Sequence, residues 1–551
     1  MVGTDRSSDG PHLLGHWPLR GDCRDHSGNS RHGANHGVQL DDGGFDGRGA
    51  HIEVPAHTGL SFGVDDFTLA AWVHTEDDLE DVRGDILCGL DPGARRGFTL
   101  GLGASAGGYS SMGDACHVHF GIDNGIVSSW EYCGRPSGTS NYVSNSLTVY
   151  DGSLYAAITD AERFEDWCHV FRHAGGEEWE DCGRVGDRKT HGVGPMVVHQ
   201  GHLYAATWTY DWTRAGLQEP YDDYGCVYRY EGGAEWANVG QPGEARRLFA
   251  LASYRGRLYV TAEGGCCYVW DGDDQWSVAG RFPNYAHPMG IHDGRLFAGV
   301  LNPAGVWAFD GALWEHVGNP QGSENRCNQI HALEVYRDRL HATTWPEGHV
   351  CALEPDGSWE DLGRLGESLE INALVVHNGK LYGGTIPYAE VFRCDGIGKW
   401  TRLHRFHEPE GGDFRSSNDW ARVTSLAVYG GRLFASVGNC TSSVLDSPAD
   451  YRGSVWSMGA GTSVTYGRDI GSGWRHIAAV KRGDRLELYV NGEPVATSTR
   501  FDAAAYDLSA AVPLRIGSGE TGSFNGRLRD VRVYRGALRA SAIATLAATR
   551  P

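Results

Sequence analysis

The stretch ALASYRGRLYVTAEGGCCYVWDGDDQWSVAGRFP, residues 250–283, decides the fold of this 551-residue chain. Two apolar runs joined by an R-G turn fill residues 250–261, and two further runs joined by a D-G turn fill residues 266–283. Short apolar runs that alternate with Gly-containing turns are typical of antiparallel strands. The stretch therefore predicts four strands that pair in sequence order.

The inner hairpin of this unit recurs seven times in the middle of the chain. A period of forty-odd residues (about 47) with four strand signals is typical of β-propeller blades. A propeller gathers one loop from every blade around a single axial mouth, so function is best sought in a ring of equivalent positions. The hairpins are SLTVYDGSLYAA (146–157), PMVVHQGHLYAA (195–206), ALASYRGRLYVT (250–261), PMGIHDGRLFAG (288–299), ALEVYRDRLHAT (332–343), ALVVHNGKLYGG (373–384) and SLAVYGGRLFAS (425–436).

The two ends of the repeat region predict how the ring closes. SSWEYCGRP (128–136) has the pattern of a fourth strand with no hairpin before it, and RGSVWSM (452–458) has the pattern of a third strand with no fourth. Joining the two completes the seventh blade. We therefore expect the propeller to span residues 128–458.

The segments on either side of the repeats are also rich in strand patterns. HWPL, the D-x-S-G-N turn that begins at Asp25 and FTLAAW (67–72) lie on the amino-terminal side, and WRHIAAV, LYVNG and FNGRLRDVRVY lie on the carboxyl-terminal side. In this order the six runs resemble LamG-like (concanavalin A-like) jelly rolls. The resemblance implies one jelly-roll β-sandwich built from 1–127 and 459–551, with the seven-bladed β-propeller inserted in one of its loops. The ends of a closed propeller lie side by side, which suits such an insertion.

Composition limits the possible partners and compartments. The formal charge of −22 disfavours nucleic acid and anionic membranes as partners, and the sequence has no run of about 18 apolar residues that could span a bilayer. Thirteen cysteines without a C-x-x-C pair are expected to be reduced, buried residues. No secretory leader is visible at the amino terminus, which predicts a cytoplasmic protein, or a secreted one if a leader has been removed.

Aligning the seven hairpins brings polar residues to the mouth of the propeller. Just before the first strands stand Asn145, Gly194, Phe249, His287, His331, Asn372 and Thr424. Two residues further out stand Val143, Gly192, Arg247, Tyr285, Gln329, Glu370 and Arg422, with Tyr142, His191 and Asn328 nearby.

The charge of this ring is opposite to that of the chain. Arg246, Arg247, Arg326 and Arg422 face few acids, Glu370 and Asp419 among them. Such a ring favours an anionic ligand such as a uronate. Aromatic residues after the second strands suit the stacking of sugar rings; they are Trp208, Trp345, Tyr210, Trp212, Tyr221 and Tyr224.

These residue types match the needs of a polysaccharide lyase. β-Elimination requires a cation beside the uronate carboxylate, a base for the C5 proton and a proton donor for the leaving oxygen. The catalytic candidates are His287, His331, Tyr285, Arg247 and Arg422. The substrate-binding candidates are Tyr142, Asn145, His191, Asn328, Asn372, Trp208 and Trp345. The mouth resembles propeller-type polysaccharide lyases in residue types, and the blades resemble kelch-like repeats. These polar residues would equally suit a watery axial channel with no catalytic role.

Two metal sites are predicted as well. Propeller oligogalacturonate lyases hold a divalent metal with His and Gln, and the resemblance implies that His191, His287, His331 and Gln329 could do so here. Many LamG-like domains carry calcium, for which Asp25, Asn29 and Asp530 are the candidate ligands. The alternative for Asp25 is an Asx-turn that binds its own backbone.

Three functions remain open from the sequence. The first is a carbohydrate-active lyase on uronate-containing poly- or oligosaccharides. The second is a glycoside hydrolase at the same mouth, which needs two carboxylates about 5–9 Å apart; the candidates are Glu370, Asp419 and Glu263. The third is a non-catalytic module that binds glycans or proteins. Convergence of His287, His331, Tyr285 and Arg247 on one point would favour chemistry over binding.

Overall fold

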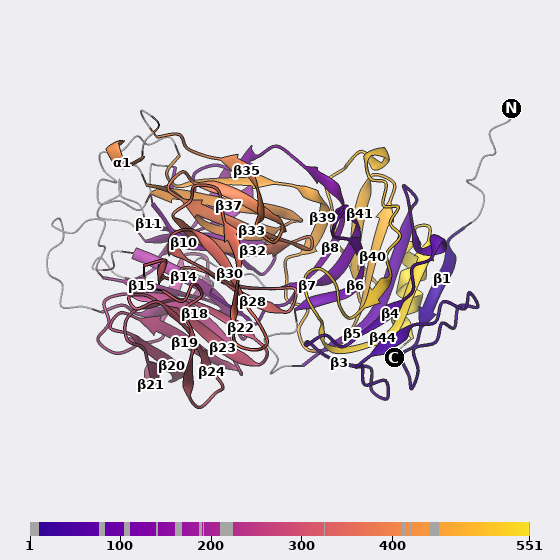
Figure 1. Ribbon diagram of the computed structural model, residues 1–551, viewed down its shortest axis with the longest axis horizontal. Coiled ribbons are helices and arrows are strands. Elements are labelled where there is room, and N and C mark those ends of the chain that lie inside the picture. Colours follow the sequence, from indigo (N-terminus) through magenta and orange to yellow (C-terminus); the bar gives the residue numbers. More distant parts are fainter. Residues whose placement is uncertain are drawn as a thin grey trace.

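We describe the fold from a computed structural model of the full chain. Its described residues are 10–76, 83–103, 111–138, 142–159, 168–186, 190, 192–209, 224–323, 325–409, 412, 414–417, 420–439 and 451–549, with backbone alone at 142–145 and 416–417. The protein is all-β and consists of a seven-bladed propeller and a concanavalin A-like jelly roll (Figure 1).

Each blade is a four-stranded antiparallel sheet, and six blades use strands that follow one another directly in the chain. Blade one consists of β10 (Tyr142–Tyr150), β11 (Ser153–Thr159), β12 (His169–Gly175) and β13 (Glu178–Arg184). Blade two consists of β14 (Gly192–His199), β15 (His202–Trp208), β16 (Val227–Gly232) and β17 (Glu235–Asn238). Blade three consists of β18 (Leu248–Tyr254), β19 (Arg257–Ala262), β20 (Cys266–Gly272) and β21 (Gln275–Arg281). Blade four consists of β22 (Ala286–His292), β23 (Arg295–Val300), β24 (Gly305–Phe309) and β25 (Trp314–Gly318). Blade five consists of β27 (Leu333–Tyr336), β28 (Arg339–Thr343), β30 (His349–Leu353) and β31 (Trp359–Arg364). Blade six consists of β32 (Glu370–His377), β33 (Lys380–Ile386), β34 (Glu390–Gly396) and β35 (Lys399–Arg405).

The seventh blade closes the ring with strands from both ends of the repeat region. β36 (Ala421–Tyr429), β37 (Arg432–Asn439) and β38 (Ser454–Met458) come from the end, and β9 (Glu131–Tyr132) comes from the beginning. Trp456 of β38 pairs with Tyr132 of β9. The predicted closure is therefore confirmed, and the short helix α1 (Phe414–Ser417) precedes this blade.

In the second, third and sixth blades, the tryptophan of the fourth strand bonds its blade to the one before it. The indole Nε1 of Trp236 donates to the Cys182 carbonyl at 2.9 Å, and that of Trp276 donates to the Val239 carbonyl at 3.0 Å. Trp400 makes the same bond to Leu362 at 2.9 Å. A large apolar ring with one donor suits this position, because it fills the gap between blades and satisfies an edge carbonyl.

The jelly roll has two sheets that are built from both ends of the chain, indigo and yellow in Figure 1. The distal sheet has the order β1 (His12–Trp17), β44 (Asn525–Arg535), β5 (Phe67–Thr75), β40 (Gly473–Arg482), β41 (Arg485–Val490) and β42 (Glu493–Thr497), with β3 (Gly44–Asp46) beside β44. The proximal sheet has the order β2 (Ala34–His36), β4 (His51–Val54), β43 (Leu514–Ile516), β6 (Gly84–Asp91), β7 (Arg96–Gly103), β8 (His117–Val127) and β39 (Ala460–Tyr466).

Alternation along the strands forms the core between these sheets. Phe67, Leu69, Ala71 and Val73 of β5 point inward and are at most 1% exposed. The outer residues of β5 lie beneath helix α2 (Ala540–Ala548) at one end, where Ala70 packs in the same cluster as the helix. Period-two burial is what a sheet with one face on a core requires.

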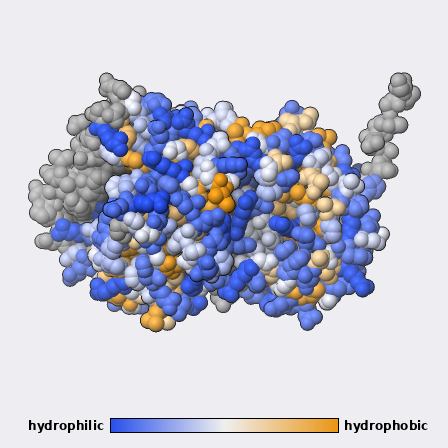
Figure 2. All heavy atoms as spheres, in the orientation of Figure 1, coloured by the Kyte–Doolittle hydropathy of each residue, from blue (hydrophilic) through white to orange (hydrophobic). Residues whose placement is uncertain are grey.

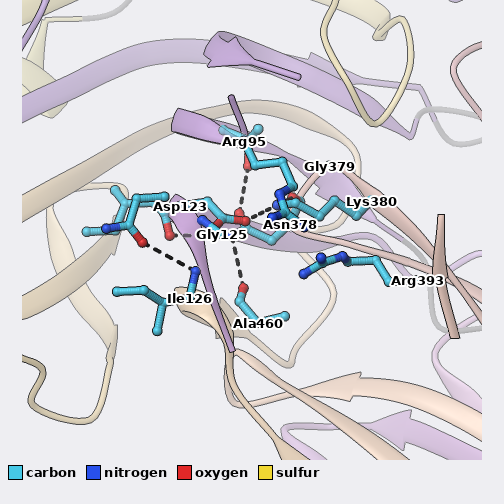
Figure 3. A network of polar contacts seen from close by, with 12 residues as sticks. Arg95, Asp123, Gly125, Ile126, Asn378, Gly379, Lys380, Arg393 and Ala460 are labelled. Carbon is cyan, nitrogen blue, oxygen red and sulfur yellow. Dashed lines mark hydrogen bonds and ion pairs between the residues drawn. The ribbon is translucent and has the colours of Figure 1, made fainter. Parts of the chain in front are cut away.

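The proximal sheet of the jelly roll lies against the end of the propeller that carries the turns between first and second strands. Asn378 in one such turn accepts a hydrogen bond from Thr99 of β7 at 3.2 Å and donates to Ala460 at 3.1 Å. The ammonium of Lys380 contacts the carboxylate of Asp123, and both side chains are buried (Figure 3). The jelly roll therefore covers one end of the propeller axis.

The remaining composition-based predictions concern cysteines and membranes. All twelve cysteines within the described residues are free, and most are buried, as expected. Within the described residues no helix is long and apolar enough to cross a membrane. The face shown in Figure 2 is mainly hydrophilic, with apolar residues scattered over it.

Candidate functional site

The aligned mouth residues lie inside the first strands and not before them, which corrects the expected strand starts. The register of β18 shifts between Leu248 and Ala250, so that Phe249 is the bulged residue. Asn372 occupies the same place in β32, and His287 lies within the shifted part of β22. The same shift occurs in β10, β14 and β36. A bulge turns one side chain away from the regular alternation, and here it repeats at the mouth.

The fifth blade places its histidine at the mouth through a break in the strand and not through a bulge. Its innermost segment is split into β26 (Cys327–Gln329) and β27, and His331 lies between the two. Gln329 pairs with Trp345 of β29 (Trp345–Pro346). The split strand leaves His331 among the bulged residues of the neighbouring blades.

The two histidines meet at the mouth of the propeller. The ring centroids of His287 and His331 are 5.2 Å apart with an interplanar angle of 70°. His331 Nδ1 is 3.6 Å from Glu370 Oε1, and His331 Nε2 is 2.8 Å from Gln329 Oε1. Because an amide oxygen only accepts, Nε2 carries a proton and Nδ1 faces the carboxylate. This cluster joins blades four, five and six.

Arg247 stands beside this cluster between two aromatic rings. Its guanidinium carbon lies 5.4 Å from the Trp208 ring centroid and 5.0 Å from that of Phe249. Phe249 in turn packs on His287 at 4.5 Å and on Tyr285 at 5.6 Å between ring centroids. Such stacking holds a cation in place without neutralising its charge. Arg247 and Tyr285 are half-buried, so their polar ends remain available to a ligand.

Burial and positive charge keep both histidines neutral. Burial lowers the pKa of His287 well below its usual value, and His331, Arg247 and Arg422 lower it further. Burial also lowers the pKa of His331, where Glu370 acts in the opposite direction and Arg422 in the same one. The two arginines thus act electrostatically on the histidines, and the local sign is positive in a chain of charge −22.

Asn372 is the least exposed polar residue of the cluster, at 1%. Neither its amide nitrogen nor its amide oxygen has a hydrogen-bond partner among the described residues. Asn328 is half-buried, and its side-chain oxygen likewise has no partner among them. Buried amides normally find partners, so both side chains are equipped to bind a ligand.

Other predicted residues lie elsewhere or outside the described residues. Arg326 is exposed and bonds Glu347 at 3.1 Å, so its charge is neutralised away from the histidines. The side chains of Tyr142 and Asn145 lie outside the described residues, as do His191, Tyr210, Trp212, Tyr221 and Asp419. Arg246 is exposed, and Tyr224 is half-buried.

Two glycines of the second blade have a role that was not predicted from the sequence. A Cβ at Gly192 would lie 1.5 Å from Trp208 Nε1, and one at Gly194 would lie 2.4 Å from Trp208 Cζ3. The indole of Trp208 therefore occupies the space that side chains fill in the other blades. The signal was present in the alignment, since blade two alone has glycine at both ring positions and a tryptophan at the end of its second strand.

The predicted calcium ligands are engaged with protein donors. Asp25 accepts bonds from the backbone amides of His16, Ser27 and Arg31 at 2.8–3.0 Å. Asp530 pairs with His16 and Arg532. Asn29 donates its amide to Leu13 and Leu14 carbonyls at 3.0 and 3.1 Å. The backbone bonds of Asp25 form an Asx-turn, and the calcium site stays a prediction. Among the described residues no group of three or more His, Cys, Asp or Glu side chains is placed to hold a metal ion.

Comparison with known proteins bears on the jelly roll. Residues 416–544 match the family described as Concanavalin A-like lectin/glucanases superfamily. The chain contains a LamG-like domain. The matched segment runs from α1 in the approach to the seventh blade to α2, and it includes the jelly-roll strands β39 to β44. No curated protein matches the chain.

Solved structures resemble the chain at low identity. A catalytically inactive variant of virginiamycin B lyase from Staphylococcus aureus with quinupristin has a TM-score of 0.45 at 9% identity and covers 61% of this chain and 99% of its own. The RRP9 WD40 repeats have a TM-score of 0.42 at 13% identity and cover 61% and 99%. A nidogen/laminin complex has a TM-score of 0.32 at 12% identity and covers 48% and 94%.

Proposed function

We propose that the protein is a carbohydrate-active lyase that cleaves uronate-containing poly- or oligosaccharides at the propeller mouth. The fold and the matched family description support a carbohydrate-related or binding role. The observation that carries the proposal further is the cluster of His287, His331 and Glu370, with Arg422 acting on both rings and Arg247 acting on His287.

The arginines supply the first requirement of β-elimination. A uronate carboxylate beside Arg247 and Arg422 has its charge neutralised, which makes the neighbouring C5 proton more acidic. Arg247 is held between two rings and half-buried, so it is the arginine that meets the carboxylate at the surface of the mouth. Arg422 is 5% exposed and contributes from beneath.

The histidines supply the proton transfers. His287 is neutral at neutral pH and can take the C5 proton; the electron pair then forms the C4–C5 double bond as the C4–O bond breaks. The leaving oxygen needs a proton, which His331 or Tyr285 can give. His331 is neutral in the free protein, and a proton taken up at Nδ1 would form an ion pair with Glu370, so this carboxylate favours the protonated form that a donor requires.

Absorbance of the unsaturated uronate product tests the proposal. Purified protein is incubated with a panel of uronate-containing poly- and oligosaccharides, with and without chelator. We expect a rise in absorbance that falls about 10²–10⁴-fold in His287→Ala and His331→Ala. His202→Ala is the matched control, because this exposed histidine lies at the start of β15, the second strand of its blade, at the end of the propeller opposite to the mouth. A flat trace with every substrate would reject the lyase.

The same assay addresses the metal and the hydrolase. Chelator sensitivity would indicate a divalent metal at His191, His287, His331 and Gln329. Release of reducing ends without unsaturated product would indicate a glycoside hydrolase at the same mouth. Glu370 contacts His331, and the backbone amide of Glu263 donates to the Arg247 carbonyl at 2.8 Å.

A non-catalytic glycan- or protein-binding module is the second candidate. The burial of Asn372 with both amide atoms unbonded among the described residues favours it, because such a side chain can anchor a ligand without chemistry. Binding of a uronate oligosaccharide with no product formed, abolished in Asn372→Ala, would establish this function in place of the lyase.

A further inference from the structure

The base of the propeller axis holds a second cluster of histidines, far from the mouth. Glu370 at the start of β32 belongs to the mouth, and His377 at its end lies at the base, roughly 23 Å away at ~3.3 Å per residue. A cavity of about 670 Å³ lies there between the propeller and the proximal sheet. Its walls include Leu102, Val376 and Val428, together with His117, His119 and His377.

The three histidines come from both domains. His117 and His119 are two residues apart on β8, so both project from the same side of the proximal sheet toward the propeller. The rings of His119 and His377 are in edge contact with centroids 5.3 Å apart. His377 is 2% exposed, and neither of its ring nitrogens has a hydrogen-bond partner among the described residues.

Among the described residues no carboxylate forms an ion pair with these rings. Burial alone lowers the pKa of His117 to about 4; burial lowers that of His119 to about 4, against a small opposing effect of the Asn378 amide. Burial lowers the pKa of His377 well below its usual value, and His119 adds to the effect. Three neutral imidazoles therefore line one cavity.

The other charged or titratable groups around the cavity are already paired or protonated. Burial, with Glu520 and Asp338 nearby, raises the pKa of Asp85 to about 7. Burial lowers the pKa of the Lys380 ammonium to about 7, and the adjoining Asp123 carboxylate favours its charged form (Figure 3). The remaining groups are Glu520 paired with Arg337, Asp338 bonded to Ser523, Arg468 paired with Asp151, Asp469 bonded to the Cys116 amide, and the buried Cys88 and Tyr382.

We propose that His117, His119 and His377 form an acid-sensitive latch between the two domains. Protonation on acidification places like charges on His119 and His377, whose ring centroids are 5.3 Å apart, while Asp85, the carboxyl among the described residues that line the cavity, is protonated below its pKa of about 7. Water then enters, and the proximal sheet parts from the turns of blades six and seven.

The rest of the interface limits how far the domains separate. Met112 is 1% exposed and lies within the propeller, where its backbone bonds Leu251 and Ser253 at 3.1 and 2.8 Å. At the two connections between domains, Ser128 and Gly459 bond each other at 2.8 Å. Opening is therefore local, at the side of His377, while the segment around Met112 stays in place.

Linkage fixes how steeply this opening depends on pH. Between about pH 6.5 and pH 4 each released histidine gains one proton, because its pKa returns to its usual value of 6.5. Asp85 releases one proton on opening, because its pKa returns from about 7 toward 3.8. Lys380 is protonated in both states below pH 7. Three protons gained and one released leave a net uptake of two, so the opening constant rises by up to about 100-fold per pH unit.

Hydrogen exchange of the full chain, followed by mass spectrometry from pH 7.5 to pH 4.5, tests the proposal. Protection factors are corrected for the intrinsic pH dependence of exchange. We expect peptides covering residues 117–121 and 376–380 to lose protection with a slope of about two on a logarithmic scale, while those of β5 and β18 keep it. A slope of zero in the first two peptides, or an equal loss in all four, would overturn the latch.

Two variants change the slope in opposite directions, which a merely structural role would not do. His377→Gln removes one proton acceptor and should lower the slope to about one, whereas Asp85→Asn removes the opposing group and should raise it to about three. His476→Gln is the matched control, because His476 is 3% exposed with a pKa of about 4 but lies on the distal sheet. If His377→Gln does not fold, His117→Gln takes its place. Unchanged slopes in the folded variants would reject the assignment.

Discussion

Gly192→Ala tests whether the glycines of blade two exist to admit Trp208. The new Cβ would lie 1.5 Å from Trp208 Nε1 and 1.9 Å from Cε2, far inside any real contact. Gly192 is itself buried, so the methyl group has no solvent-exposed space to turn into. The indole must therefore leave its place, although Trp208 is only 3% exposed and packs beneath Arg247.

The expected loss follows from these distances. Overpacking costs about 1–3 kcal/mol, and complete removal of a buried tryptophan side chain costs about 3–5 kcal/mol. A partly displaced indole should therefore lower the free energy of unfolding by about 2–4 kcal/mol. For a propeller of about 330 residues, with an unfolding entropy near 2.1 cal/mol/K per residue, this corresponds to a fall of roughly 3–6 °C in the thermal midpoint.

Calorimetry with two matched variants makes the test sharp. Gly103→Ala is the control, because no described residue lies within 4 Å of its Cβ position, and its midpoint should stay within about 1 °C of the parent. Gly192→Ala combined with Trp208→Phe should be more stable than Gly192→Ala alone, because the smaller ring vacates the positions of Nε1 and Cε2. A midpoint for Gly192→Ala equal to that of Gly103→Ala would refute the reasoning.

Three further predictions concern other parts of the molecule. Asp85→Asn should raise the free energy of unfolding by up to about 4 kcal/mol at pH 8 and by progressively less down to pH 4. The pKa of the Asp85 carboxyl is raised from 3.8 to about 7 in the folded state, so keeping this group ionised there costs free energy that grows as the pH rises. Unfolding followed from pH 4 to pH 8 should show the difference between the two proteins, and a gain that is constant with pH would contradict it. Trp236→Phe should lose about 1–2 kcal/mol with its bond to the Cys182 carbonyl, measured against Trp314→Phe, whose indole nitrogen has no partner among the described residues; equal losses would contradict the interblade bond. If calcium binds at Asp25, millimolar calcium should raise the thermal midpoint and Asp25→Asn should abolish the rise; an unchanged midpoint would leave Asp25 as a turn residue.

The sequence predicted the fold correctly because its signals are local. The hairpin turns, the period-two apolar pattern and the recurring tryptophans each act within one blade or between adjacent blades. Even the closure of the ring could be read from a lone fourth strand at one end and a lone third strand at the other, and Tyr132 does pair with Trp456. The LamG-like domain was recognised from runs of residues that form contiguous strands.

The residues of the mouth were predicted in part, because aligning the blades gives equivalent sequence positions but not the directions in which the side chains point. Alignment placed His287, His331 and Arg247 in one ring, and the structure brings them together. It could not show that Arg326 turns outward to Glu347, or that Glu370 faces His331. Those outcomes depend on bulges and on a split strand, which are properties of strand pairing.

The sequence by itself thus determined the blades, the closure and the jelly roll, because each rests on strand periodicity and turn residues that are legible over a few tens of residues. Only the tertiary structure decided what the two domains make together. His119 and His377 are 258 positions apart, and nothing in either strand indicates that their rings touch. Their contact exists because the jelly roll covers one end of the propeller axis, and that docking depends on surfaces which form only after both domains have folded.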